Sequence, residues 1–249
     1  MNILVTGGGT VAPIDDVRQI ANMSTGRFSS AISEAALWRG GRVWHLHAPG
    51  ALTPFALQSR FDLDAEPTAE FDRLRRVKLD WDEVRDRLTV VPIRPGTVEE
   101  YATTLRSLLL TEPIDAAFLA MAVSDFAPDP DPGKLSSDAD ELVLHCRRMP
   151  KVIRSVRDWA PSIYLVGFKL LSGSTEAELI DRARKSGEAN RADLTVANDA
   201  RLLRAGRHTI HLVRSGRPAE TIGPRGDLAD ALVDRVETWA SIRSREGAV

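Results

Sequence analysis

Short apolar runs alternate with segments of helical periodicity along most of the chain. A run of about four to eight apolar residues suits a buried strand, whereas apolar residues three or four apart form one face of a helix. Strands are predicted at residues 2–6, 42–47, 88–93, 114–123, 141–146, 163–170 and 193–199. Helices are predicted from Gly26, within 71–87, from Thr97, from Pro150, over 175–189 and from Asp227.

Local signals mark several helix ends and turns. Thr97 and Glu100 have the spacing of a capping box, in which each side chain satisfies a free amide at the helix start. Residues 207–222 have the pattern of a hairpin that turns near Ser215. Residues 124–138 contain prolines and a glycine, so we expect no regular structure there.

The alternation of strands and helices predicts one α/β domain over residues 1–249, because no long linker divides the chain. We expect a doubly wound, mainly parallel sheet with helices on both faces. In such sheets ligands bind beyond the carboxyl ends of the strands. Four segments at strand ends are therefore candidates for one site: residues 7–10, 124–126, 168–170 and 197–199.

Composition narrows the classes of function. The formal net charge of -2 over 249 residues gives no global basic field for binding nucleic acid or an anionic membrane. No apolar run approaches the ~20 residues of a membrane span, and no signal peptide is visible. The sole cysteine, Cys146, excludes an internal disulfide and fits a reducing compartment, so we expect a cytoplasmic protein.

The first predicted strand runs into three glycines. Because they lack Cβ atoms, Gly7, Gly8 and Gly9 let backbone amides approach an anion, and a plain tight turn is the alternative. The match to the dinucleotide fingerprint is poor, since Ala12 stands where a third glycine belongs and Pro13 prevents an immediate helix. The loop therefore gives weak support to a dehydrogenase.

A polar insert separates these glycines from the first helix. Arg18 and Asn22 lie four residues apart within it, and Ser24, Thr25 and Gly26 lead into the helix. Hydroxyls and a glycine at a helix start either cap the helix or hold a phosphate. Capping accounts for Ser24 or Thr25, but it does not account for Arg18 and Asn22.

Other candidate groups are less specific. Lys134 lies in the proline-rich loop on the expected ligand side, where it either reaches a phosphate or is simply solvated. His45 and His47 share one strand face, but no third metal ligand accompanies them, so core histidines are favoured and no metal ligand is assigned. No Ser–His–Asp set or pair of acids is evident from spacing.

Together these segments resemble the phosphopantothenate–cysteine ligase family. The stretch "ILVTGGGTVAPIDDVRQIANMSTGR" is similar to the family motif GGT-x-x-P-I-D-x-V-R-x-I-x-N-x-S-S-G-[KR]. Later stretches resemble further family motifs in the same order: "AMAVSDFAP", "GKLSSDADELVL", "MPKVI", "VGFKL" and "DLTVAND". The resemblance covers roughly residues 2–200.

The resemblance implies a Rossmann-like fold, a homodimer and a reaction of coenzyme A synthesis. In this family a nucleoside triphosphate, ATP or CTP, acts with Mg²⁺ to activate the carboxylate of 4'-phosphopantothenate as an acyl-nucleotidylate. Pyrophosphate is released, and the amine of cysteine then displaces the nucleoside monophosphate. The family is often fused to a flavin-dependent decarboxylase; no such segment is visible in this sequence, so we expect no FMN.

The resemblance also implies roles for matched residues. Asn22 would hold the acyl-nucleotidylate, Arg18 would position the loop, and Lys134 would steady charge on the transferring phosphates. The expected nucleotide contacts are Gly8, Gly9, Thr10, Ala122, Asp125, Pro150, Lys151, Val152, Ile153 and Phe168. The expected contacts of the other substrate are Ser24, Thr25, Gly26, Arg27 and Asn198.

The sequence departs from the family pattern at a few positions. The CTP-using bacterial branch carries lysines in the helix before the A-N-D strand, where this chain has Ser186 and Asn190, with Lys185 beside them, and this favours ATP. Ser29 replaces the glycine that usually follows the Ser-Ser-Gly-[KR] turn, and Thr25 replaces its second serine.

Two other functions are considered. A short-chain NAD(P)-dependent reductase would need a Tyr-x-x-x-Lys pair, but Tyr101 and Tyr164 are followed four residues later by Leu105 and Phe168. A non-catalytic nucleotide-binding relative of the ligases stays open, because the helix lysines are missing.

Overall fold

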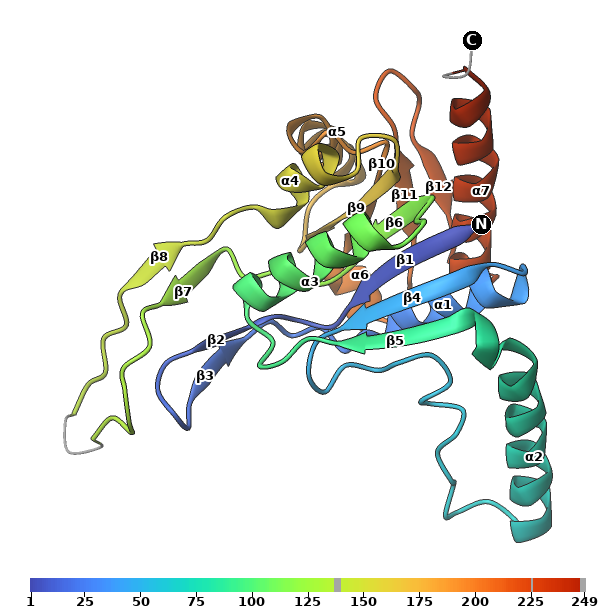
Figure 1. Ribbon diagram of the computed structural model, residues 1–249, viewed down its shortest axis with the longest axis horizontal. Coiled ribbons are helices and arrows are strands. Elements are labelled where there is room, and N and C mark those ends of the chain that lie inside the picture. Colours follow the sequence, from blue (N-terminus) through green and yellow to red (C-terminus); the bar gives the residue numbers. More distant parts are fainter. Residues whose placement is uncertain (137–139, 225, 247–249) are drawn as a thin grey trace.

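The computed structural model describes residues 1–136, 140–224 and 226–246, and an eight-stranded sheet forms its centre (Figure 1). Its strands are β1 (Asn2–Gly7), β4 (Arg42–His47), β5 (Leu88–Pro92), β6 (Ala116–Leu119), β9 (Tyr164–Leu171), β10 (Leu194–Asp199), β11 (Ile210–Val213) and β12 (Glu220–Ile222). The order is β12-β11-β10-β9-β6-β1-β4-β5. All neighbours from β10 to β5 pair in parallel, and β11 and β12 form an antiparallel edge. The predicted Rossmann-like, mainly parallel sheet is confirmed.

The order of the strands reverses at the middle of the sheet. From β1 the chain adds β4 and β5 on one side, then returns to add β6, β9 and β10 on the other. The loops that follow β1 and β6 therefore start at neighbouring strand ends and run in opposite directions. This reversal is the point at which doubly wound sheets bind ligands.

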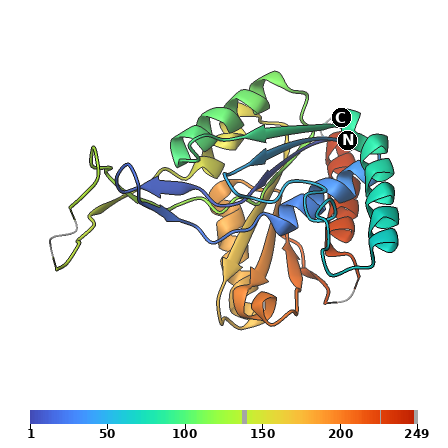
Figure 2. The ribbon, with the colours of Figure 1, turned by 90° about the horizontal axis from the view of Figure 1, so that it is seen from below.

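Helices cover both faces of the sheet (Figures 1 and 2). α1 (Arg27–Trp38) and α7 (Leu228–Glu246) lie on one face, and α3 (Val98–Thr111), α4 (Val152–Trp159) and α5 (Glu176–Asn190) lie on the other. Alternate residues of β1 serve the two layers, since Ile3 and Val5 belong to the α1 side and Leu4 to the α3 side. Burial on both faces explains why the parallel strands have nearly continuous apolar sequences.

The two remaining α-helices lie at the edges of this arrangement. α2 (Pro67–Val84), followed by the 3₁₀ turn η1 (Arg85–Arg87), extends beyond β5 and begins before the range 71–87 within which a helix was predicted. Glu66 sets this start, because its carboxylate accepts the amides of Thr68 and Ala69. The short α6 (Ala200–Arg204) directly follows β10.

The predicted helix caps are only partly as expected. Thr97 accepts the amide of Glu100 at 3.2 Å, which is one half of the expected capping box. The reciprocal arrangement occurs instead at the start of α5, between Thr175 and Glu178. Asp227 accepts the amides of Ala229 and Asp230 at 2.9 and 3.0 Å, so its predicted cap on α7 is confirmed.

Two predictions of local structure were wrong. Residues 141–145 are not a strand: β8 (Cys146–Arg148) begins only at the last residue of the predicted run. Its antiparallel partner, β7 (Phe126–Pro128), lies inside the segment that was expected to lack regular structure. A proline is tolerated there because the ribbon has only two strands and free edges.

A second ribbon interrupts the path from β1 to α1. β2 (Val11–Pro13) pairs with β3 (Gln19–Ala21) in antiparallel fashion. Both ribbons leave the carboxyl edge of the sheet and project away from the body of the protein (Figures 1 and 2). The polar insert of the sequence is therefore an arm, and we call the β2–β3 and β7–β8 ribbons together the arms.

None of the helices in the described residues has the length and apolar character needed to cross a bilayer.

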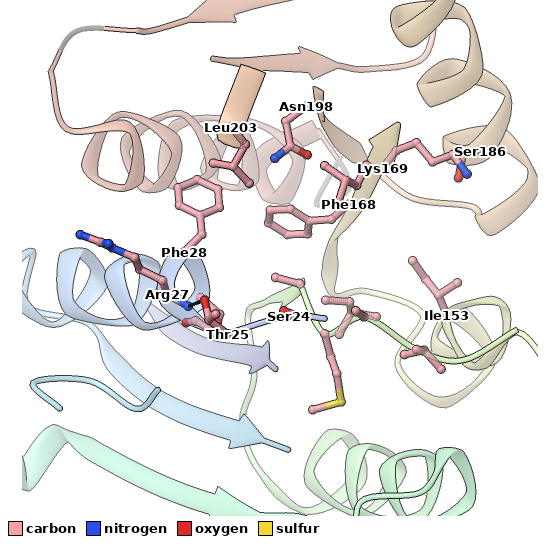
Figure 3. A pocket seen from close by; sticks show the side chains of 18 of the residues that line it. Ser24, Thr25, Arg27, Phe28, Ile153, Phe168, Lys169, Ser186, Asn198 and Leu203 are labelled. Atoms are coloured by element: carbon pink, nitrogen blue, oxygen red, sulfur yellow. Dashed lines mark hydrogen bonds between the residues drawn. The ribbon is translucent and has the colours of Figure 1, made fainter. Parts of the chain in front are cut away.

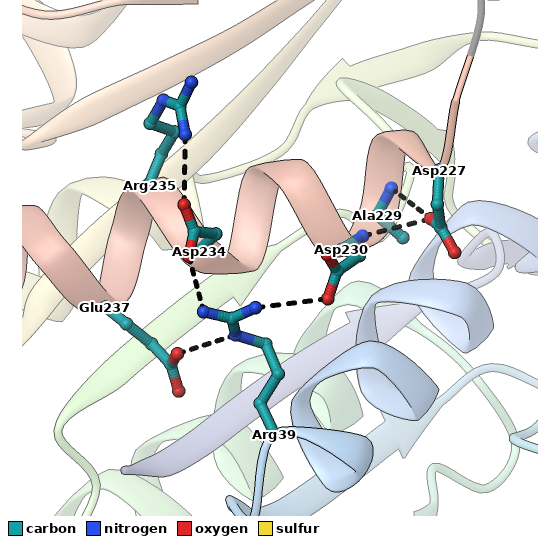
Figure 4. Close-up of polar contacts among 7 residues, drawn as sticks. All are labelled: Arg39, Asp227, Ala229, Asp230, Asp234, Arg235 and Glu237. Atoms are coloured by element: carbon teal, nitrogen blue, oxygen red, sulfur yellow. Dashed lines mark hydrogen bonds and ion pairs between the residues drawn. The ribbon is translucent and has the colours of Figure 1, made fainter.

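An ion-pair network joins the end of α1 to α7 (Figure 4). The guanidinium of Arg39 donates to Glu237 at 2.8 Å, to Asp230 at 3.3 Å and to Asp234 at 2.5 Å. These acids occupy one face of α7, where without a cation they would repel one another. Bonding to Glu237 raises the pKa of Arg39.

We expect Arg39→Ala to lower the free energy of unfolding by about 1 kcal/mol, because the partners are partly exposed and screened by water. Urea unfolding would measure this difference, which should shrink in 1 M salt as screening increases. Arg42→Ala is the control, since Arg42 is exposed and makes no ion pair within the described residues. Equal losses in the two variants would contradict a role for the network.

Candidate functional site

Backbone hydrogen bonds close the gap where the strand order reverses. The amide of Thr10 donates to the carbonyl of Ala122 at 3.0 Å, and the amide of Ala122 donates to Gly8 at 2.8 Å. Side chains add to the join, since the hydroxyls of Thr10 and Ser124 lie 3.1 Å apart. A Cβ on Gly9 would come within 2.4 Å of the carbonyl oxygen of Asn22, so this position requires glycine. The loops after β1 and β6 thus form one continuous unit.

A cavity of about 1340 Å³ opens beside this join, between the start of α1 and the ends of β9 and β10. Phe168 and Lys169 alternate at the end of β9, so their side chains leave opposite faces of the sheet (Figure 3). The cavity consequently has one side next to α1 and another between α4 and α5.

The side next to α1 is aromatic. Phe28 and Phe168 meet edge to face with ring centroids 6.3 Å apart, and His208 contacts Phe28 at 4.8 Å. Asn198 and Leu203 lie above the two phenyl rings (Figure 3). Such a surface suits a flat ring or an apolar chain.

The side between α4 and α5 carries polar side chains. Gly167 leaves room for Ile153, because a Cβ there would lie 3.2 Å from its Cδ1. Lys169 extends toward Ser186 (Figure 3). Asn190 donates to the hydroxyl of Ser186 at 3.2 Å, so these two side chains form one polar pair.

Cations outnumber acids on the wall of the cavity. Its basic side chains, besides His208, are Arg27, Lys151, Arg154, Lys169, Arg182 and Lys185. Asp125 and Asp227 are its acids, and Asp125 is paired with Lys151. Within the described chain Arg27, Arg154, Lys169 and Arg182 make no ion pair. A cavity with free cations in a protein of net charge -2 favours an anionic ligand.

The start of α1 faces the same cavity. Gly26 is the N-cap residue with φ 75°, and no side chain caps the helix. Thr25 does accept the amide of Arg27, at 3.3 Å, just inside the helix. Other amides of the first turn are left for a ligand, and this geometry suits a phosphate or carboxylate. Ser29 fits without displacing the loop, since its hydroxyl donates to Gly26 at 2.8 Å.

The structure divides the predicted site residues into two groups. The following line the cavity: Ser24, Thr25, Gly26, Arg27, Ala122, Asp125, Pro150, Lys151, Val152, Ile153, Phe168 and Asn198. The following do not: Gly8, Gly9, Thr10, Arg18, Asn22 and Lys134. The second group forms the join between the loops or lies on the arms.

Asn22 belongs to the join. Its amide nitrogen donates to the carbonyl of Ala122 at 2.9 Å and to the hydroxyl of Ser124 at 3.1 Å. The backbone of Asn22 also bonds to Thr10. The donors of this side chain are therefore used within the protein, and its carbonyl oxygen is left for other partners.

Arg18 and Lys134 lie together on the arms. Arg18 forms an ion pair of 3.0 Å with the buried Asp15, and Lys134 is exposed on the neighbouring loop. Burial by itself would raise the pKa of the Asp15 carboxyl, but amides of Val17, Leu135 and Arg18, together with the Arg18 guanidinium, lower it.

Several cavity residues were not predicted from the sequence. Lys169 adjoins the predicted Phe168, and strand alternation could have identified it as a contact on the opposite face. Arg182 and Arg154 lie on helices, where nothing in the local pattern marks them as different from solvated charges. His208 and Leu203 follow β10 in a segment without any motif.

Metal-binding groups are sparse. Among the residues that the structure describes, no group of three His, Cys, Asp or Glu side chains could hold a metal ion. His45 is buried, and its Nδ1 lies 2.8 Å from the hydroxyl of Ser33 beneath the glycine loop. Its ring stacks near that of His47, with centroids 6.2 Å apart.

Comparison with known proteins gives a consistent result. Residues 1–66 and 89–239 match the family described as "DNA/pantothenate metabolism flavoprotein C-terminal domain". The unmatched residues between these ranges correspond closely to α2 and η1.

Two curated relatives and one solved structure illustrate the similarity. The chain is 30% identical over 238 residues to the coenzyme A biosynthesis bifunctional protein CoaBC of Thermococcus kodakarensis, covering 94% of this chain and 50% of the relative. It is 26% identical over 275 residues to the mouse (Mus musculus) phosphopantothenate–cysteine ligase, covering 99% of this chain and 86% of the relative. The DNA/pantothenate metabolism flavoprotein of Streptococcus pneumoniae superposes with a TM-score of 0.76 at 28% identity, covering 96% of this chain and 99% of that one. The chain thus spans about half the length of the bifunctional relative.

Burial, followed by the neighbouring His47, lowers the pKa of His45 from 6.5 to about 4. The unfolded chain therefore binds more protons between these values, so stability should fall as the pH drops from 6.5 toward 4. The loss should reach roughly 3 kcal/mol at most. Urea unfolding at several pH values would measure it.

His45→Asn should flatten this dependence while keeping a partner for Ser33. His145→Asn, on an exposed residue, should keep the wild-type slope. Parallel curves for wild type and His45→Asn would contradict the assignment.

Proposed function

The chain belongs to the DNA/pantothenate metabolism flavoprotein C-terminal domain family, and we propose that it is a phosphopantothenate–cysteine ligase. The observation that carries the proposal is the cavity at the strand reversal, whose walls contain parts of the family motifs and cations that make no ion pair within the described residues. A curated relative of similar length carries that enzyme's name. We treat the chain as one ligase domain, in agreement with the continuous sheet.

The proposed reaction has two steps. The carboxylate of 4'-phosphopantothenate attacks the α-phosphorus of a nucleoside triphosphate, and the bond to pyrophosphate breaks. The amine of cysteine then attacks the resulting acyl carbon, which forms an amide, releases the nucleoside monophosphate and frees a proton. Neither step needs a nucleophile from the protein, so the residues act by positioning and by offsetting charge.

The cavity residues can divide these tasks. We assign the nucleotide to Ala122, Asp125, Phe168 and the segment from Pro150 to Ile153, where Phe168 offers a ring for stacking. The start of α1, with Ser24, Thr25, Gly26 and Arg27, offers amides and a cation for anionic groups of the substrates. Asn198 is assigned to the pantothenate part.

The choice of nucleotide depends on the side between α4 and α5. Ser186 and Asn190 bond to each other there, and we favour ATP on this ground and on the sequence departures already described. Lys169, whose side chain extends toward Ser186, is a candidate cation on that side (Figure 3).

A magnesium ion would be held mainly by the nucleotide. Asp125 and Asp227 are the carboxylates on the cavity wall, and Mg²⁺ typically binds to phosphates with one or two carboxylates and retains waters. When bound, the ion neutralises phosphate charge. The free, exposed thiol of Cys146 suits a reducing compartment, so we place the reaction in the cytoplasm.

Two copies would complete the site. Arg18 and Lys134 lie on arms that project away from the body, whereas the cavity lies beside the sheet (Figure 1). We propose a homodimer in which the arms of each copy supply cations to the cavity of the other. The ribbons have free edges and exposed apolar side chains, including Ile20 and Phe126, which suits such an interface.

The ligase assay is the direct test. The protein is incubated with 4'-phosphopantothenate, cysteine, Mg²⁺ and ATP, CTP, GTP or UTP in turn, and pyrophosphate and product are measured. We expect product with ATP above the other nucleotides. Nucleotide binding without product would favour the non-catalytic relative, and product with CTP alone would reverse the nucleotide assignment.

The Asn22→Asp variant tests the assigned role of the join. A carboxylate would oppose the carbonyl of Ala122, and we expect kcat to fall by roughly a hundredfold, since such positioning groups contribute about this much. Its unfolding midpoint should change far less. Wild-type turnover would remove Asn22 from the mechanism.

Mixing two inactive variants tests the exchange of arms. Lys134→Glu alters the arm and Lys151→Glu alters the cavity wall, and both positions are exposed. After subunit exchange at equal amounts, one intact site should form in each hybrid dimer, which restores about a quarter of the activity. If each arm serves its own cavity, mixing should restore nothing.

A further inference from the structure

A buried carboxylate joins the two arms. Oδ1 of Asp15 accepts the amides of Val17 and Arg18 at 2.9 and 2.7 Å, within the first arm. Oδ2 accepts the amide of Leu135, in the second arm, at 3.1 Å, and the guanidinium of Arg18 at 3.0 Å. The side chain of Asp15 has no exposed surface, although the arms project from the protein.

Backbone bonds continue this junction on both sides. The amide of Asp16 donates to the carbonyl of Gly133 at 3.0 Å, and the amide of Asp131 donates to Ile14 at 2.9 Å. Both neighbours of Lys134 are therefore held: Gly133 through its carbonyl and Leu135 through its amide. The side chain of Lys134 itself is exposed.

The junction thus fixes two cations relative to each other. Arg18 is oriented by its ion pair with Asp15, and its guanidinium also reaches the carbonyl of Leu135 at 3.5 Å. Lys134 is presented one residue before Leu135. None of the four donors to Asp15 comes from the side chain of Lys134, so the exposed ammonium of Lys134 can contact an anion.

We propose that Asp15 is a positioning residue, which holds Arg18 and Lys134 as one unit that clamps the phosphates of the nucleotide. The inference rests on the proposed ligase function for the identity of the anion. A lysine on a held loop loses less conformational entropy on binding than a lysine on a free loop. Asp15 would therefore act on nucleotide binding and phosphate transfer without touching either substrate.

The matched variants are Asp15→Asn and Asp16→Asn. In Asp15→Asn the amide oxygen can still accept from Val17 and Arg18, but the amide nitrogen faces the donors of Leu135 and Arg18 and cannot accept them. Asp16→Asn removes a charge from the same turn and keeps the backbone bond to Gly133, because that bond uses the main-chain amide.

Residue-resolved amide hydrogen exchange gives a readout that is independent of activity. In Asp15→Asn the Leu135 amide should exchange about ten- to a hundredfold faster, as expected for a lost bond to a charged acceptor. Amides of β1 and β6 should keep their rates in both variants, and Asp16→Asn should resemble the wild type. Unchanged exchange at Leu135 would overturn the proposed junction.

Kinetics then tests whether Asp15 acts through the cation. We expect Asp15→Asn to raise the KM for the nucleotide and lower kcat/KM roughly tenfold, less than a direct phosphate contact would. Added to the double variant Arg18→Ala/Lys134→Ala, it should cause no further loss, since both cations through which Asp15 acts are then absent. Additive losses would mean that Asp15 acts elsewhere.

Failure of the ligase proposal is distinguishable from failure of this one. If the wild type makes no product but Leu135 exchanges faster in Asp15→Asn, the junction stands and the assigned anion is wrong. If the wild type is active and Asp15→Asn has wild-type kinetics and exchange, the ligase stands and the positioning role is wrong.

Discussion

The hydrogen-bonded join between the loops after β1 and β6 is the constraint on which the site depends. Neighbouring parallel strands whose connections leave in opposite directions open a gap at their carboxyl ends. Here Thr10, Ala122 and Gly8 close part of that gap through main-chain bonds. The closure is possible only because Gly9 has no side chain to strike Asn22. What remains open beside the join is the cavity.

The same join explains why the arms exist. Both loops continue past the closed gap as two-stranded ribbons, so each arm begins where a central strand ends. Short ribbons have little core of their own. A buried carboxylate, Asp15, compensates by gathering donors from both ribbons in a place where water does not compete. The electrostatic contact therefore replaces apolar packing where the two arms meet.

Charge is distributed unevenly for a related reason. On the body of the protein cations pair with acids, as Arg39 does with the acidic face of α7. Around the cavity several cations make no ion pair with an acid among the described residues. Leaving them unpaired raises the local positive potential, which attracts an anionic ligand and is relieved when that ligand binds. Fold stability and ligand recognition thus use the same side-chain types in opposite ways.

The sequence alone determined the strands that are buried along their whole length and the helices whose first residues carry a capping side chain. The apolar runs of β1, β4, β9 and β10 lie almost where they were predicted, because strands buried on both faces allow little else. The motifs also indicated part of the cavity wall, since the carboxyl ends of parallel strands meet at one edge. Only the tertiary structure decided that Arg18 and Lys134 lie outside the cavity of their own chain. The second arm forms by pairing β7 with β8, which are nearly twenty residues apart, and no local sequence pattern predicts that pairing. It also decided that Lys169 and Arg182 share a wall, since the two are brought together by the packing of a helix on a strand and by no feature of their sequence neighbours.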